Sequence, residues 1–401
     1  MKIGIIREGK IPSDNRVALI PEHCKLLITE KKIEIFVEPS PHRCYPDAAY
    51  ENAGAKLTDD LSACDILLGI KEVPVAQLLP QKTYCFFSHT IKKQAHNRKL
   101  LQAVLEKKIH LIDYEILKNE KQQRLIAFGK FAGMVGAHNG VLAYGARTGL
   151  YDLPRLNSLL HYEDAVNIYK KFQLPSLKIV LTGHGRVAGG ALQVLSDMGI
   201  EQVNPYDFLS RKFDNAIFTQ LKPADYAAPV DNSAYSKHNF YTYPEKYVSI
   251  FAPYYRVADI LVNGIFYEKN APMFFTGAEM QQPDFKIKVI ADISCDLIPN
   301  SSIPSTLHAT TIANPFFGYN KNTKIETAPF DAGAVTMMTI DNLPNELPRD
   351  ASGYFGEQFI DYILPELLKE NSEVIKNATI AENGHLAAKF NYLQDYLNHD
   401  S

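Results

Sequence analysis

The sequence predicts an α/β protein of two domains, and three observations support that prediction. The chain has 401 residues, which is too long for one compact core. Residues 1–130 alternate short apolar runs with polar, helix-like stretches, a rhythm typical of parallel strands joined by helices. A separate strand–turn–helix pattern at Ile179–Ile200 indicates a second sheet farther along the chain.

The composition is that of a globular protein without a strongly charged partner. Hydrophobic residues make up 46% and charged residues 22%, and the formal net charge of −3 gives no electrostatic reason to expect nucleic acid or an anionic membrane. No apolar run approaches the roughly 18 residues of a membrane span, and the chain opens on a strand-like segment. Five cysteines are scattered without metal-ligand spacing. We therefore expect reduced thiols, no metal site and a cytoplasmic location.

The elements of the first half follow from its apolar periodicity. The first predicted strand leads into Arg7-Glu8-Gly9-Lys10 rather than a glycine fingerprint, so this half is not predicted to bind a nucleotide. Helices are expected at Pro21–Glu30 and Lys92–Glu106. The predicted strands are Lys2–Arg7, Ile33–Glu38, Ile66–Ile70, Thr83–Phe87 and Ile109–Tyr114.

Two helices are predicted between the halves. Gly129–Gly149 has small residues at frequent intervals in a helix-like pattern, which predicts a long helix packed close to its neighbours. Apolar residues at helical spacing between Ala165 and Phe172 predict an amphipathic helix before the next strand.

The strand–turn–helix segment reads IVLTGHGRVAGGALQVLSDMGI. In a dinucleotide site, Gly183 would allow the tight turn, Gly185 would let the backbone approach a pyrophosphate, and Ala188 would let helix and strand pack closely. The N–H groups at the helix start, at Arg186 and Val187, would face the phosphates. The alternative is an ordinary strand–turn–helix whose glycines serve only the turn. The flanking strand and helix favour the dinucleotide site.

The second half continues with a short second strand and then a long aromatic stretch. Tyr206–Arg256 is rich in tyrosine and phenylalanine and poor in strand pattern. Strands resume at Ala258–Asn263 and Lys288–Ile293, and the polar residues at their ends, Asn263 and Asp292, are expected where a sheet edge faces ligand. Asp292 and Asp296 form an acidic pair after the strand, but no third ligand suggests a metal. A closing helix at Tyr354–Lys369 is expected to pack back onto the first domain.

Several polar side chains of the first half stand beside strand ends, where the carboxyl edge of a parallel sheet would bring them together. A partly desolvated lysine at Lys71 would be a usable base, and His89 would exchange protons near neutrality. Glu115 and Arg124 follow at the next strand. Each residue alone also fits a solvated surface role, and Arg16 alone fits a surface salt bridge.

At these residues the chain resembles lysine–2-oxoglutarate reductases, the reductase half of the bifunctional aminoadipic semialdehyde synthases of animals and plants. Fungal NAD-dependent saccharopine dehydrogenase (lysine-forming) looks like a nearer cousin than alanine dehydrogenase, within an alanine dehydrogenase–transhydrogenase-like superfamily. The resemblance extends from Lys2 to about Tyr396. The blocks that carry it include LLPQKTYCFFSHTIKKQ, IHLIDYE, RLIAFGKFAG, TGHGRVAGGA, ILVNGIFYEKNAP, VIADISCD and TIDNLPNELPRDASGYFG.

The resemblance implies a fold and a reaction. It implies two Rossmann-like domains with a cleft between them, residues 1–130 plus 345–401 forming the substrate domain and the inserted residues 131–344 forming the dinucleotide domain. The implied reaction is the reductive condensation of L-lysine with 2-oxoglutarate to saccharopine, or its reverse. The bifunctional relatives carry a second, glutamate-forming dehydrogenase, which would here be a separate pathway partner.

The resemblance also assigns roles to residues of the first half. Lys71 and His89 match the acid–base pair of the family, and Glu72 and Glu115 match the acids that tune it. Arg16 and Arg124 match arginines that hold substrate carboxylates, for which a bidentate guanidinium is suited.

The choice of cofactor is predicted less directly. NAD-preferring enzymes usually place an acid near the end of the second strand, and here neutral Asn204 stands at that position, with Asp207 slightly later. Arg211 and Lys212 are close enough in sequence to meet a phosphate, or else belong to a solvated loop. The animal and plant reductases that the chain resembles look NADPH-preferring and the fungal enzyme NAD-preferring. We expect NADPH, with NADH as the alternative. The predicted cofactor contacts are Gly183, Gly185, Arg186, Val187, Ala188, Asn204, Asn263 and Asp292.

Two other functions fit the same sequence. One is a related opine-type or amino-acid dehydrogenase, close to alanine dehydrogenase, with a different amine and keto acid. The other is a catalytically silent nucleotide-binding protein, which the retention of Lys71, His89 and the glycine fingerprint argues against.

Overall fold

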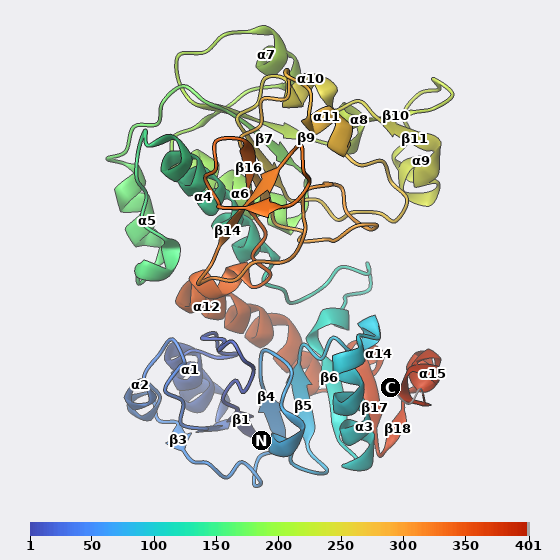
Figure 1. Ribbon diagram of the computed structural model, residues 1–401. Helices are drawn as coiled ribbons and strands as arrows, with labels where there is room; N and C mark the ends of the chain where they lie inside the picture. The colour runs from blue at the N-terminus through green and yellow to red at the C-terminus, as the bar shows by residue number, and fades with distance from the viewer. Residues whose placement is uncertain (399–401) are drawn as a thin grey trace. The chain divides into compact units, whose positions relative to one another are not determined.

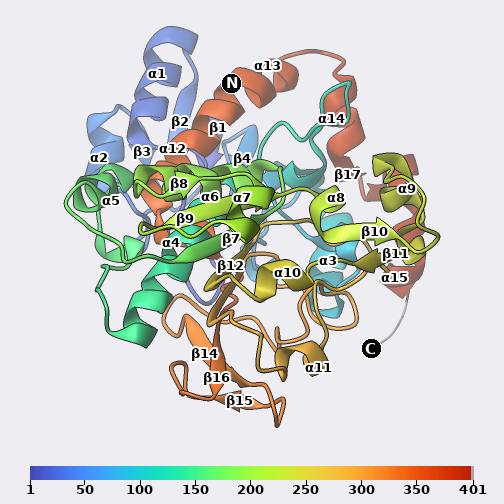
Figure 2. The same cartoon turned by 90° about the horizontal axis from the view of Figure 1, so that it is seen from above.

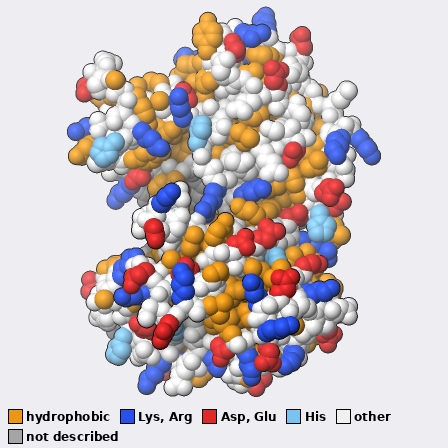
Figure 3. Space-filling model, turned by 180° about the vertical axis from the view of Figure 1, so that it is seen from behind, with side chains coloured by type: hydrophobic (Ala, Val, Ile, Leu, Met, Phe, Trp, Pro, Cys, Tyr) orange, Lys and Arg blue, Asp and Glu red, His pale blue; other side chains and the backbone are white. Residues whose placement is uncertain are grey.

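The computed structural model describes residues 1–398 and divides into two compact units. Unit 1 consists of Met1–Phe128 together with the chain from Pro348 onward, and unit 2 consists of Gly129–Leu347 (Figure 1). Every helix within residues 1–398 is too short or too polar to cross a membrane. Acidic and basic side chains are interspersed on the face of each unit seen in Figure 3.

Unit 1 is built on an eight-stranded sheet. Its strands are parallel except at one edge, where the two strands from the C-terminal part of the chain run antiparallel. All five strands predicted in this half are confirmed, although each ends slightly earlier than expected. The order across the sheet is β18 (His385–Leu386), β17 (Thr379–Glu382), β6 (His110–Asp113), β5 (Thr83–Phe86), β4 (Ile66–Leu68), β1 (Lys2–Ile5), β2 (Glu34–Val37) and β3 (Lys56–Leu57).

One helix of unit 1, α12 (Pro348–Gln358), belongs to the C-terminal part of the chain. Phe355 of this helix stacks on Phe128, with ring centroids 4.6 Å apart, and meets Tyr114 edge-on at 5.1 Å, which confirms that the closing helix packs onto the first domain. The second helix predicted in this half begins later than expected, because Thr90–Lys92 and Ala95–Asn97 form 3₁₀ turns. The helices are α1 (Pro21–Lys31), α2 (Asp47–Asn52), α3 (Arg98–Glu106), α12 (Pro348–Gln358), α13 (Leu364–Leu367), α14 (Glu373–Ala378) and α15 (Gln394–Asn398), with a π-helical turn at Phe359–Ile363.

Unit 2 is built on a second eight-stranded sheet, again parallel except at one edge. The strand of the glycine fingerprint is β7, and it lies inside the sheet with a parallel neighbour on each side. The order is β15 (Glu326–Thr327), β14 (Phe316–Asn320), β16 (Ala334–Met338), β13 (Val289–Asp292), β12 (Ile260–Asn263), β7 (Lys178–Thr182), β9 (Ile217–Leu221) and β8 (Glu201–Gln202).

Two helices of unit 2 touch through their glycines. The long helix α4 (Gly129–Thr148) packs on α6 (Arg186–Asp197), the helix that follows the fingerprint (Figure 1). A β-carbon added at Gly133 would overlap the carbonyl of Val187, and one added at Gly190 would overlap the carbonyl of Lys130. The prediction of a long, closely packed helix is therefore confirmed. The amphipathic helix predicted after it is α5 (Tyr162–Tyr169).

The aromatic stretch contains a strand that the sequence pattern did not indicate. β9 lies between β7 and β8, so the short second strand is not the neighbour of the fingerprint strand. β9 is buried along nearly its whole length and so lacks the alternation that marks a half-buried strand. The rest of the stretch forms α7 (Pro205–Ser210), α8 (Pro223–Tyr226), β10 (Ala227–Pro229), α9 (Lys237–Thr242), β11 (Tyr247–Ser249) and α10 (Ala252–Tyr255), and β10 pairs with β11 beside α9 (Figure 2).

Candidate functional site

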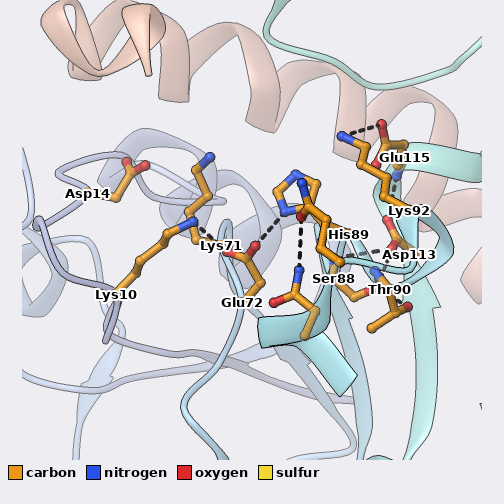
Figure 4. Close-up of polar contacts among 12 residues, drawn as sticks. Lys10, Asp14, Lys71, Glu72, Ser88, His89, Thr90, Lys92, Asp113 and Glu115 are labelled. Carbon is orange, nitrogen blue, oxygen red and sulfur yellow. Dashed lines mark hydrogen bonds and ion pairs between the residues drawn. The ribbon is translucent and has the colours of Figure 1, made fainter. Parts of the chain in front are cut away.

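The ionisable residues predicted in unit 1 follow three neighbouring parallel strands. Lys71 lies after β4, His89 after β5 and Glu115 after β6, and these strands are adjacent in the sheet. Because carboxyl ends of parallel strands meet at one edge, the topology brings the three side chains to the same edge. Figure 4 shows Lys71, Glu72 and His89 side by side, with the Glu115 side chain farther along the row.

Glu72 is bonded to one member of the predicted acid–base pair, His89, and to Lys10. Its Oε1 lies 2.6 Å from Nδ1 of His89, and its Oε2 accepts a hydrogen bond from Nζ of Lys10 at 3.1 Å (Figure 4). Burial alone would raise the pKa of the Glu72 carboxyl, but the hydrogen bond and charge of His89, with Lys10, hold it well below its usual range. Glu72 therefore stays ionised and orients the imidazole of His89.

The backbone at Lys71 is held by a carboxylate that sequence reasoning missed. Glu8 accepts the backbone N–H of Ile70 at 2.6 Å and that of Lys71 at 2.8 Å, one with each oxygen. Burial, and then the charge of Asp14, raise the pKa of Glu8 to about 8. The available signal was the charged Arg7-Glu8-Gly9-Lys10 run after β1, because β1 is the strand next to β4.

Lys71 itself is in an environment that disfavours its charge. Burial is the largest cause that lowers the pKa of its ammonium, and the positive charge of Arg16 adds to it, while Asp14 and Glu72 act in the opposite direction. The neutral amine is therefore more accessible near neutral pH than in a solvated lysine. This is the property that the strand-end position of Lys71 predicted.

His89 is positioned by a small buried network. The residue has a left-handed backbone conformation with φ of 51°, which a side chain other than glycine adopts only when its surroundings hold it there. Asp113, fully buried at the end of β6, accepts hydrogen bonds from the backbone N–H of Ser88 at 3.1 Å and from its hydroxyl at 2.5 Å. The Ser88 hydroxyl also lies 2.8 Å from that of Thr90. The network fixes the turn on both sides of His89, and sequence reasoning did not identify Asp113 as part of it.

The other predicted residues of unit 1 have partners of their own. Glu115 forms an ion pair with Lys92 at 3.3 Å. Arg16 is buried and pairs in a bidentate manner with Asp14, at 2.9 Å through Nε and 2.6 Å through Nη2. Its guanidinium also lies 4.2 Å from the ring centre of Phe128. Arg16 is thus part of a buried ion pair and not the surface salt bridge that the residue alone suggested.

Arg124, the second predicted carboxylate-binding residue, lies on the loop between β6 and α4. The side chain is half-buried, and its backbone pairs with that of Lys118 in an antiparallel bridge. The loop thus returns on itself directly after the strand end that carries Glu115.

The glycine fingerprint of unit 2 has the geometry of a dinucleotide loop. Gly183 has φ of 100°, and a β-carbon there would lie 2.6 Å from the carbonyl oxygen of Gly264. Gly185 precedes the first turn of α6, and a β-carbon there would face open space. Ala188 is fully buried, whereas Arg186 at the helix start is exposed. The open N-terminus of a twelve-residue helix fits a pyrophosphate.

The strand beside the fingerprint is tied to the loop by two hydrogen bonds. The N–H of Gly183 donates to the carbonyl of Leu221 at 3.1 Å, and the side-chain amide of Gln220 donates to the carbonyl of Gly183 at 2.8 Å. The expectation that the second strand along the chain would carry the ribose-contacting position is therefore wrong about the neighbour of β7. Asn204 follows the outer strand β8 and caps α7, its side chain accepting the N–H of Asp207 at 2.9 Å. Lys222 comes directly after β9, which pairs with β7.

Asn263 and Asp292 form a buried hydrogen-bond network across three strand ends. Both are fully buried, and the Asn263 amide donates to Asp292 at 2.9 Å while its carbonyl accepts from Thr182 of β7 at 2.8 Å. Ser302 accepts a further bond from Asn263 at 3.1 Å, and Thr306 donates to Asp292 at 2.6 Å. Burial raises the pKa of the Asp292 carboxyl against the effect of these hydrogen bonds. These contacts fix the carboxyl ends of β7, β12 and β13 relative to one another.

A cavity of about 700 Å³ opens beside the glycine loop, within the size range of small-molecule sites. It lies entirely within unit 2. The segment after β9, helix α9 and the loop after β12 form its other walls. The residues that line it include Gly183, His184, Gly185, Lys222, Tyr226, Tyr235, Lys237, Phe240, Tyr241, Gly264, Phe266 and Glu268. The cavity and the loop geometry together fit a bound dinucleotide.

The fold places the chain in a known structural class. An L-alanine dehydrogenase superposes with a TM-score of 0.68 over 99% of this chain and 100% of that one, at 16% identity. A transhydrogenase from Sinorhizobium meliloti superposes with a TM-score of 0.61 over 96% of this chain and 100% of that one, at 15% identity. The chain therefore has the two-domain, Rossmann-like fold of alanine dehydrogenase.

Sequence comparison identifies its relatives. Residues 4–135 match the family described as the alanine dehydrogenase/PNT N-terminal domain. The mitochondrial alpha-aminoadipic semialdehyde synthase of Mus musculus is 31% identical over 97% of this chain, and the corresponding protein of Arabidopsis thaliana is 29% identical over 98%. Saccharopine dehydrogenase [NAD(+), L-lysine-forming] of Emericella nidulans is 27% identical over 94% of this chain and 95% of that protein. The chain is a homologue of both groups.

The chain spans less than half the length of the synthases it matches. The matched region covers 47% of the mouse protein and 41% of the Arabidopsis protein. The likeness to the fungal saccharopine dehydrogenase, by contrast, extends over nearly the whole of each chain.

Proposed function

We propose that this protein is a nicotinamide-dependent saccharopine dehydrogenase of the L-lysine-forming type, which condenses L-lysine with 2-oxoglutarate reductively or catalyses the reverse oxidation. The observation that carries the proposal is the row of Lys71, Glu72 and His89 at adjacent strand ends, with Glu72 bonded to His89 at 2.6 Å. Relatives with that activity in their names align over most of the chain.

Lys71 and His89 move the protons of this reaction. The lysine ε-amine must lose a proton before its nitrogen attacks the keto carbon, and the keto oxygen must gain protons before it leaves as water. Lys71, whose pKa is lowered by burial, accepts the proton of the amine, and His89 donates to the keto oxygen. Glu72 holds the imidazole in place for this exchange. Glu115, at the next strand end, tunes the acid–base pair through its negative charge.

Arg16 and Arg124 bind the carboxylates of the substrates. A guanidinium matches a carboxylate in a bidentate geometry and stays charged at any physiological pH. Arg16 is already oriented by its bond to Asp14 and its contact with Phe128. A substrate carboxylate at Arg16 would share with Asp14 a guanidinium that is already fixed in place.

The glycine loop of unit 2 holds the cofactor. When bound, a nicotinamide dinucleotide supplies the hydride that reduces the carbon–nitrogen double bond, or accepts it in the reverse direction. Gly183 and Gly185 leave room for the backbone to meet the pyrophosphate, and the N–H groups from Arg186 to Ala188 face it. Asn263 and Asp292 act by fixing the strand ends beneath the loop. We propose NADPH as the preferred form.

Cofactor oxidation measured on the full chain tests the proposal. NADPH, and NADH in parallel, would be mixed with the protein, L-lysine and 2-oxoglutarate, with controls that omit each substrate in turn. We expect oxidation that requires both substrates. Nucleotide binding without oxidation under these conditions would sink the proposal and direct the search to other amine and keto-acid pairs, or to a protein that binds nucleotide without turnover.

A further inference from the structure

In unit 2 the strand beside β7, on the side away from β12, is β9 and not β8. The residue expected to face a bound nucleotide is therefore the one that follows β9. In an open parallel sheet, the side chain at the carboxyl end of the strand next to the fingerprint strand reaches the adenosine ribose. That neighbour is β9, and its register with β7 is continuous from Lys178↔Ile217 to Thr182↔Leu221. The first residue beyond this pairing is Lys222.

The backbone of Lys222 is held close to the glycine loop. The two hydrogen bonds that join Gly183 to Gln220 and Leu221 anchor the strand end immediately before it. The backbone N–H of Lys222 donates to the carboxylate of Asp225 at 2.9 Å, which fixes the start of α8. The backbone of Lys222 is thus constrained while its ammonium remains exposed and lines the cavity.

A second lysine lines the same cavity from another element. Lys237 lies in the first turn of α9, which also contributes Phe240 and Tyr241 to the cavity wall. The carboxylate in the lining, Glu268, comes from the loop after β12, on the side of β7 away from β9. The segment after β9 therefore contributes one positive charge to the cavity, and α9 contributes a second together with aromatic surface suited to a purine ring.

The basic residues considered from the sequence lie at the opposite edge of the sheet. The ammonium of Lys178, the first residue of β7, donates to the carbonyl of Arg211 at 3.2 Å. Arg211 and Lys212 are consequently near the amino ends of the strands. Crossing the length of β7 to the glycine loop would take about 13 Å at the usual rise per residue. They are placed too far from the loop to meet a phosphate on the ribose.

We propose that Lys222 and Lys237 bind the 2′-phosphate of an adenosine ribose and so make this protein select the phosphorylated dinucleotide over its unphosphorylated form. The inference rests on the proposed cofactor site and names the residues that set its specificity. An ammonium stabilises a phosphate dianion strongly and gives no comparable gain to a ribose hydroxyl. The aromatic residues of the cavity wall would pack against the purine.

Binding of two adenosine fragments to the full chain tests this assignment without any turnover. Adenosine 2′,5′-bisphosphate and adenosine 5′-monophosphate would be titrated calorimetrically into the wild type and into Lys222→Ala, Lys237→Ala and Lys222→Arg variants. We expect the wild type to prefer the bisphosphate by about tenfold or more, and either alanine variant to lose about tenfold of bisphosphate affinity with the monophosphate unchanged. Lys222→Arg should keep the preference.

Lys212→Ala is the matched control, because it removes an exposed lysine from the other edge of the same sheet. It should leave both affinities unchanged. Equal affinity of the wild type for the two fragments would overturn the proposal, and so would a Lys222→Ala variant that weakens both fragments alike. Because neither fragment needs an amine or a keto acid, a failure of the proposed reaction would leave this result intact, and the two failures are distinguishable.

Discussion

The two sheets of the protein share an architecture but differ at their carboxyl ends. In unit 1 the strand ends lead to Lys71 and His89, which are only partly buried. In unit 2 the corresponding ends carry Asn263 and Asp292, which are fully buried and bonded to one another. The same parallel arrangement therefore gives an edge with ionisable groups in one unit and a rigid polar frame in the other. Under the proposed function, proton transfer and cofactor binding would place opposite demands on a strand end.

Replacing Lys71 by methionine should have the largest effect on the unit 1 edge. Methionine keeps the length and apolar body of the side chain but cannot carry a proton. We expect turnover to fall by about 10²- to 10⁴-fold, the usual contribution of a general acid–base group, with nucleotide affinity unchanged. Initial rates and calorimetric binding would be measured on the same preparation. Lys99→Met, at an exposed position of α3, is the control. Turnover of Lys71→Met within a few-fold of wild type would reject the acid–base role.

Replacing Asp292 by alanine should disrupt the buried hydrogen-bond network at the strand ends of unit 2. The substitution leaves the donors of Asn263 and Thr306 buried without their acceptor. We expect the free energy of unfolding to fall by roughly 3 kcal/mol, since each orphaned buried donor costs about 1–3 kcal/mol. Urea unfolding followed by circular dichroism would measure it. Asp296→Ala, at a half-buried position nearby, should lower the free energy of unfolding by less than about 1 kcal/mol. Similar losses in both variants would contradict a stabilising role of the Asp292 hydrogen bonds.

Replacing Glu8 by glutamine should give the smallest and most pH-dependent effect. Because the folded state raises the pKa of Glu8 to about 8, from 4.5, folding favours its protonated form. Wild-type stability from this group is fully present below about pH 4.5 and falls as pH rises toward 8. Glutamine does not titrate, so the wild type should lose about 1–2 kcal/mol relative to the variant between about pH 6.5 and pH 8. Parallel unfolding curves at the two pH values that show a constant difference would refute this.

The strand ends of unit 1 were predictable because the sequence marks them. Each strand there is a short apolar run followed at once by a polar residue, so the positions of Lys71 and His89 followed from the pattern. Glu8 and Asp113 were not predictable in the same way. Their roles depend on bonds to backbone groups of other strands, which no local pattern encodes.

The strand order of unit 2 was harder to predict for a different reason. β9 is a five-residue strand, buried along nearly all its length, inside a stretch whose aromatic residues show no strand period. Whether it or β8 pairs with β7 depends on which strand buries more apolar surface beside β7, and the exposed Glu201–Gln202 pair of β8 buries little. The more apolar strand β9 therefore lies beside β7, although β8 comes earlier in the chain.

The contact between α4 and α6 limits how this part of the chain can change during evolution. At many helix contacts, a larger residue on one side can be accepted if its partner becomes smaller. Here the atoms that a β-carbon at Gly133 or Gly190 would strike belong to the main chain of the facing helix, which no substitution can shrink. Neither glycine can therefore be rescued by a second-site replacement. The two helices carry a mutual constraint that only a shift of whole backbones could relieve.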